Sequence, residues 1–107
     1  MALIDQVKRK LNITWVDEDT DGRVRDIVAS AEPVLRHRLG ITDAKFDFSN
    51  EGQENVLFLA LCLYEWNHSA NEFWTNYADD IATCRAMHEV AYYKANESED
   101  DGDVSAS

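Results

Sequence analysis

The feature of this sequence that most restricts its fold is an unbroken run of apolar side chains from Val56 to Tyr64. Leu and Ala dominate the run, and Val56 is its only β-branched residue, so the pattern favours a helix over a buried strand. The chain of 107 residues contains one Pro and four Gly, which leaves long stretches free of helix breakers. We therefore predict an all-α fold, with a helix over residues 52–69 that is buried on nearly all sides.

Helical spacing of apolar residues predicts three further helices. A short amphipathic helix covers residues 2–11, and a long one covers residues 71–93, where an apolar stripe recurs at intervals of three and four residues. Together with a second helix over residues 18–39, these segments predict a small four-helix domain. The chain has enough apolar residues to form a packed core, because 45% of its residues are hydrophobic.

The second helix carries signals at both ends and one irregularity. Asp17 begins a group of carboxylates that complement the positive end of the helix dipole, and Gly40 is a favourable stop. Pro33 lies inside the pattern and removes a backbone donor. We therefore predict a kink between Ala29 and Glu32.

Charge is distributed unevenly along the chain. The formal net charge is −11, and from Phe46 onward only Arg85 and Lys94 oppose thirteen carboxylates. Residues 95–107 contain five acids and no base, which predicts a disordered acidic tail behind a helical domain of residues 1–94. Such a balance argues against binding through phosphate neutralisation and favours repulsion from nucleic acid and anionic membranes.

The sequence predicts neither a membrane span nor a signal peptide. No segment reaches the roughly 20 apolar residues that span a bilayer. Lys8, Arg9 and Lys10 interrupt the only apolar start. Cys62 and Cys84 sit in apolar helical patterns, where reduced, buried thiols are usual.

Two segments imitate metal sites but lack a required ligand. The series Asp17, Asp19, Asp21 resembles the start of a calcium loop, yet Val28 stands where the bidentate Glu is needed. His88 and Glu89 resemble the start of a zinc-protease helix, but position 92 is Tyr instead of the second His.

The other metal and catalytic patterns are also missing. The three histidines fall on different helices or helix ends, no cysteine pair has CxxC spacing, and no Gly-rich phosphate loop occurs. Glu65 interrupts the apolar third helix. One interpretation is a carboxyl group whose shifted pKa suits general-acid chemistry, although such a residue more often pairs with a basic side chain. We predict that the protein is not an enzyme and uses no cofactor or metal.

The third helix is too apolar for a domain this small to cover it completely, which predicts contacts between subunits. Most aromatic side chains near it are expected in the core, with one or two at an interface. The basic cluster of Lys8, Arg9 and Lys10 is either a solvated face, a nucleic-acid contact or a source of ion pairs with the carboxylates of a neighbouring subunit. The candidate interface residues are Leu57, Phe58, Leu61, Tyr64 and Trp74, and the candidate ion-pairing residues are Lys8, Arg9 and Lys10.

Several segments, in their order and spacing, resemble one family over roughly residues 3–93. They are Val7–Trp15, the acidic run Asp17–Asp21, Leu39–Ile41, Phe46–Phe48, Leu61–Asn67 and Glu72–Tyr77. The set is similar to the head–tail connector (adaptor) proteins of long-tailed double-stranded DNA bacteriophages.

This resemblance implies a helical protomer, made in the bacterial host cytoplasm, that assembles into a dodecamer-like ring at the head–tail interface of the virion. Such a ring docks beneath the portal protein, extends the DNA channel and supports the stopper or tail-completion protein. Double-stranded DNA passes through without specific binding. The family carries no catalytic residues, and none is transferred to this chain.

The net charge also suggests an alternative from another class, an acidic DNA mimic that inhibits a host nuclease or repressor. Mimicry needs a rigid array of carboxylates, whereas five of the acids fall in the predicted tail. A connector subunit is therefore the preferred hypothesis.

Overall fold

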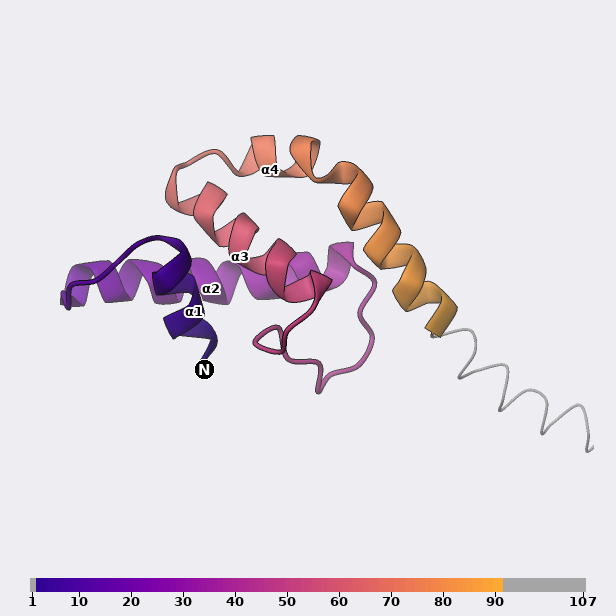
Figure 1. The fold of residues 1–107 in the computed structure, drawn as a ribbon, viewed down its shortest axis with the longest axis horizontal. Coiled ribbons are helices and arrows are strands. Elements are labelled where there is room, and N and C mark those ends of the chain that lie inside the picture. The colour runs from indigo at the N-terminus through magenta and orange to yellow at the C-terminus, as the bar shows by residue number, and fades with distance from the viewer. Residues whose placement is uncertain (1, 92–107) are drawn as a thin grey trace, which may run out of the picture.

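A computed structural model describes residues 2–91, which form five helices and no strand (Figure 1). This confirms the all-α prediction, while the predicted tail over residues 95–107 lies outside the described residues. No helix within residues 2–91 combines the length and apolar character needed to cross a membrane. The helices are α1 (Leu3–Lys10), α2 (Glu18–Arg38), α3 (Gln53–Trp66), α4 (Ala70–Asn76) and a last helix over residues 78–91.

The expected count of four helices was wrong because the helix predicted over residues 71–93 is divided at Tyr77. Tyr77 has φ −107° and ψ 16°, and its ring stacks on Phe73 with centroids 4.9 Å apart. Asp79 and Asp80 then supply carboxylates to the first turn of the last helix, which favours a new start there. Figure 1 shows the chain changing direction between α4 and the last helix.

Helix α2 begins where the sequence predicts. The Asp17 carboxylate accepts hydrogen bonds from the Thr20 backbone N–H at 3.2 Å and from the Thr20 hydroxyl at 2.8 Å, which caps the helix. The helix then runs unbroken through Pro33 to Arg38. The predicted kink between Ala29 and Glu32 is not confirmed.

Three helices end in the same way, with a left-handed residue followed by a backbone bond that reaches back across the last turn. Asn12, Gly40 and His68 have φ values of 60°, 67° and 59°. The next residue along the chain donates its N–H to the carbonyl five residues before it, at 2.8–3.0 Å. These bonds form Schellman motifs, which satisfy otherwise unpaired carbonyls. The sequence indicated only Gly40, because Asn and His adopt this conformation less often.

Helix α3 is the centre of the fold and contacts α1, α2 and α4. Figure 1 shows α3 between α2 and α4, both of which it contacts. Gly52 stands immediately before its first turn. The largest fully buried side chains are Phe48, Phe58, Phe73, Leu35, Leu39, Leu57 and Leu61.

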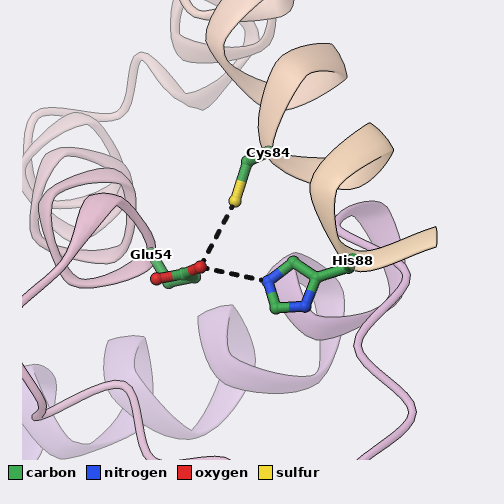
Figure 2. A group of neighbouring side chains, drawn as sticks. All are labelled: Glu54, Cys84 and His88. Carbon is green, nitrogen blue, oxygen red and sulfur yellow. Dashed lines mark hydrogen bonds and ion pairs between the residues drawn. The ribbon is translucent and has the colours of Figure 1, made fainter. Parts of the chain in front are cut away.

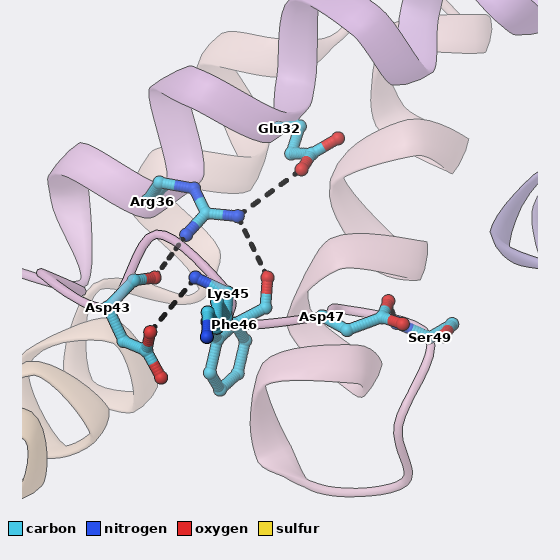
Figure 3. A network of polar contacts seen from close by, with 7 residues as sticks. All are labelled: Glu32, Arg36, Asp43, Lys45, Phe46, Asp47 and Ser49. Atoms are coloured by element: carbon cyan, nitrogen blue, oxygen red, sulfur yellow. Dashed lines mark hydrogen bonds and ion pairs between the residues drawn. The ribbon is translucent and has the colours of Figure 1, made fainter.

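Arg36 fastens the segment between α2 and α3 to the helical body (Figure 3). Its guanidinium donates to the backbone carbonyls of Asp43 at 2.9 Å and Phe46 at 3.0 Å, and it pairs with Glu32 at 3.3 Å. The same guanidinium lies 5.7 Å from the Phe48 ring. These contacts hold residues 41–50 in turns that cover one side of the core.

The buried Cys62 thiol predicts a loss of stability at high pH. Burial raises its pKa to about 12, from an ordinary value of 9.0, and Glu65 adds to the shift. The unfolded thiol ionises first, so the stabilisation is complete below pH 9.0 and is lost as pH rises toward about 12. Between about pH 8 and about pH 10.5, the urea midpoint of the wild type should fall further than that of Cys62→Ala. Equal slopes of midpoint against pH in the two proteins would contradict this assignment.

Candidate assembly surfaces

Three of the predicted interface residues are core residues of the single chain. Leu57, Phe58 and Leu61 are fully buried, and the Phe58 ring stacks on Phe48 with centroids 5.0 Å apart. Their assignment to a subunit interface was wrong. Both sides of α3 are apolar, and packing against α1, α2 and Phe48 turns this side inward.

The two remaining predicted interface residues are only half-buried. Tyr64 packs edge-on against Phe73 with centroids 5.8 Å apart, and Trp74 contacts the same ring at 4.9 Å. The Arg38 guanidinium covers Trp74, 4.8 Å from the ring centroid. Their role at an interface stays a prediction.

The exposed apolar surface of α3 lies on the side away from the predicted interface residues Leu57 and Phe58. Val56 is 60% exposed, and Leu59, one turn later, is half-buried. Leu59 lies at the edge of a groove between α1 and α3, which we call the α1–α3 groove. Its lining includes Gln6, Arg9, Lys10, Asn55 and Leu59.

The basic cluster divides into one paired and two available cations. Lys8 pairs with Asp21 within the chain at 2.6 Å, and its pairing with a neighbouring subunit stays a prediction. Arg9 and Lys10 are exposed, and neither forms an ion pair with any residue in the range 2–91. The α1–α3 groove therefore combines the apolar side chain of Leu59 with two unpaired cations and one exposed carboxylate, Glu51, which leaves one excess positive charge.

The last helix presents a second exposed apolar surface. Its inward side carries Ile81, Cys84 and His88, whereas Met87 is 61% exposed and Val90 is 53% exposed. A shallow groove runs over this outward side, which we call the Met87–Val90 surface. It is lined by Thr83, Ala86, Met87, Val90 and Ala91.

Acidic side chains lie in the same helix as the Met87–Val90 surface. Asp79 and Asp80 are exposed in the first turn, and neither pairs with a cation among the described residues. Arg85 pairs with Glu89 at 3.2 Å, which neutralises both. The Met87–Val90 surface is therefore accompanied by unpaired acids, whereas the α1–α3 groove carries one excess positive charge.

Comparison of the chain with protein-family models, with curated proteins and with solved structures finds no match.

The structure also joins three residues whose proximity the sequence analysis missed (Figure 2). Glu54 Oε1 lies 3.1 Å from His88 Nε2 and 3.7 Å from Cys84 Sγ. Burial, together with Glu54, raises the pKa of the Cys84 thiol to about 11. The four-residue spacing of Cys84 and His88 was a readable signal, because such residues share one helix face.

The segment that imitates a calcium loop has other structural roles. Asp17 caps α2, and Asp21 pairs with Lys8. These contacts explain the roles of two of the three carboxylates with no bound metal ion.

Proposed function

We propose that this protein is a subunit of a bacteriophage head–tail connector ring. The Met87–Val90 surface of one copy packs against the α1–α3 groove of the next. One observation carries this proposal: residues 2–91 expose two separate apolar surfaces of opposite net charge. Arg9 and Lys10 outnumber Glu51 at one, and Asp79 and Asp80 accompany the other. The order of segments that resembles connector proteins supports the same function.

Contact between two different surfaces of identical chains is a heterologous interface. Such an interface leaves one free surface at each end of any open oligomer, so further copies add until the ring closes. A self-complementary dimer would need a single surface to match itself, and two surfaces of like charge would repel each other. The opposite charges of the two surfaces therefore favour head-to-tail assembly.

The expected interface has an apolar centre and a charged rim. Met87 and Val90 contact Leu59 and Val56 across the interface, while the exposed cations and carboxylates pair around them. Stable interfaces bury at least about 1,000 Å² in total, and apolar contact supplies most of the attraction. Charge pairs at the rim chiefly set orientation and the rate of association.

The acidic excess suits a ring through which DNA must slide. A wall that neutralised phosphates would hold the duplex, whereas carboxylates repel it. The ring would lie beneath the portal protein in the virion and support the stopper or tail-completion protein. Assembly on the portal links ring closure to the concentration of that partner.

Replacing the apolar side chains of the Met87–Val90 surface with acidic ones tests the proposal. We expect Met87→Glu/Val90→Glu to remove ring formation while leaving the circular dichroism spectrum unchanged, because both side chains are more than half exposed. Light scattering and negative-stain microscopy measure assembly, for the protein alone and mixed with the portal protein of the same phage. A wild-type chain that stays monomeric in both samples contradicts the proposal.

A charge-reversal pair identifies which surfaces meet. Arg9→Glu/Lys10→Glu should weaken association at least about tenfold, and Asp79→Lys/Asp80→Lys should do the same. An equimolar mixture of the two variants should regain association, because the exchanged charges again attract. Loss of assembly without recovery in the mixture excludes this pairing. A monomer that instead binds a host nuclease tightly would support the DNA-mimic alternative.

A further inference from the structure

Three side chains with metal-binding atoms converge beneath the last helix. They are the carboxylate of Glu54, the thiol of Cys84 and the imidazole of His88, and one ligand atom from each lies within 4.8 Å of the other two. Figure 2 shows all three side chains pointing toward one point between α3 and the last helix.

Local structure explains this convergence. Cys84 and His88 are four residues apart in one helix, so their side chains lie on the same face, one turn apart. Glu54 projects from the first turn of α3 toward that face. The cluster thus connects two helices that meet through tertiary packing.

We propose that Glu54, Cys84 and His88 bind one zinc-class divalent cation. A sulfur, a nitrogen and an oxygen ligand suit zinc and cobalt, whereas magnesium and calcium select oxygen ligands alone. Ligand atoms about 2.0–2.3 Å from a tetrahedral cation are about 3.5 Å apart. The observed separations from the Glu54 oxygen, 3.1 Å and 3.7 Å, lie on either side of this value.

Charge and access fit the same cation. The Cys84 thiol releases its proton to solvent on binding, and its thiolate together with the Glu54 carboxylate balances a charge of +2. No Lys or Arg within residues 2–91 pairs with Glu54, and Arg85 is paired with Glu89. The side chains of His88 and Glu54 are 21% and 24% exposed, which gives a cation a route from solvent.

Three protein ligands leave a fourth tetrahedral position for water or another group. With the metal bound, the last helix is held to α3 by coordination in addition to the packing of its buried Cys84 and half-buried Ile81. Binding to the folded chain alone must raise its stability with the logarithm of the metal concentration once that concentration exceeds the dissociation constant. This inference does not depend on the proposed function.

Cobalt titration of the reduced, full-length protein, after removal of metals by chelation, tests the site. We expect one equivalent of Co²⁺ to produce the visible absorption of a four-coordinate ion and a near-ultraviolet thiolate-to-cobalt charge-transfer band. Zn²⁺ should displace it and raise the melting temperature by at least about 5 °C. A dissociation constant for Zn²⁺ weaker than about 100 µM would overturn the proposal and leave a hydrogen-bonded trio of side chains.

Variants separate this site from other metal-binding groups. Cys84→Ser should abolish the charge-transfer band, while Glu54→Gln and His88→Gln should each weaken Zn²⁺ binding at least about tenfold. Cys62→Ala is the matched control, because Cys62 is the other buried thiol and lies outside the cluster. Circular dichroism verifies that each variant is folded. A charge-transfer band that persists in Cys84→Ser, or disappears in Cys62→Ala, contradicts the assignment.

Discussion

Replacing Phe58 with Ala should lower the free energy of unfolding by about 3–5 kcal/mol. The Phe58 side chain is fully buried in α3 and stacks on Phe48 with ring centroids 5.0 Å apart. Its removal loses apolar burial and leaves a cavity that the surrounding helices fill only in part. Urea denaturation followed by circular dichroism measures the change.

The matched control is Val56→Ala, in the same helix and two residues earlier. Val56 is 60% exposed, so its truncation should change stability by no more than about 0.5 kcal/mol. If Phe58→Ala leaves stability unchanged but reduces assembly, Phe58 belongs to an interface, as the sequence had suggested.

Replacing Arg36 with Met should lower the free energy of unfolding by about 2 kcal/mol and loosen residues 41–50. Met retains much of the apolar stem but removes the hydrogen bonds to the carbonyls of Asp43 and Phe46. Bonds from charged donors are worth more than neutral ones, and both carbonyls anchor the same segment. Urea denaturation reports the global effect, and hydrogen exchange of amides 41–50 reports the local one.

Arg25→Met is the control for this prediction. Arg25 is an exposed cation in α2 whose side chain forms no hydrogen bond or ion pair with the described residues, so its replacement should be nearly neutral. Equal losses in the two variants would show that general charge, instead of the bonds made by Arg36, decides stability. Unchanged amide exchange in Arg36→Met would show that the segment is held by Phe48 alone.

Local pattern was sufficient to predict most of the helices. The start of α2 followed from Asp17, and its end from Gly40, because caps act within one turn of the chain. The division at Tyr77 was not predicted, since the apolar stripe continues across it. Stacking of Tyr77 on Phe73 is itself a local contact between residues four apart, as a continuous helix would also allow, so the spacing gave no sign of the division.

The orientation of α3 shows why Leu57, Phe58 and Leu61 were wrongly assigned to an interface. Val56 and Leu59 on one side are as apolar as Leu57 and Phe58 on the other, so periodicity alone cannot identify the buried side. Phe48, ten residues earlier than Phe58, covers one side and leaves Val56 exposed. That choice depends on neighbours that only the folded chain brings together.

The sequence by itself determined that the chain is helical and where most helices begin and end, because these properties depend on residues within one or two turns. Only the tertiary structure decided which side of α3 is hidden, that Lys8 is already paired, and that Glu54 meets Cys84 and His88. Each of these facts depends on contacts between segments distant in the chain, and these contacts are fixed by packing of the whole domain.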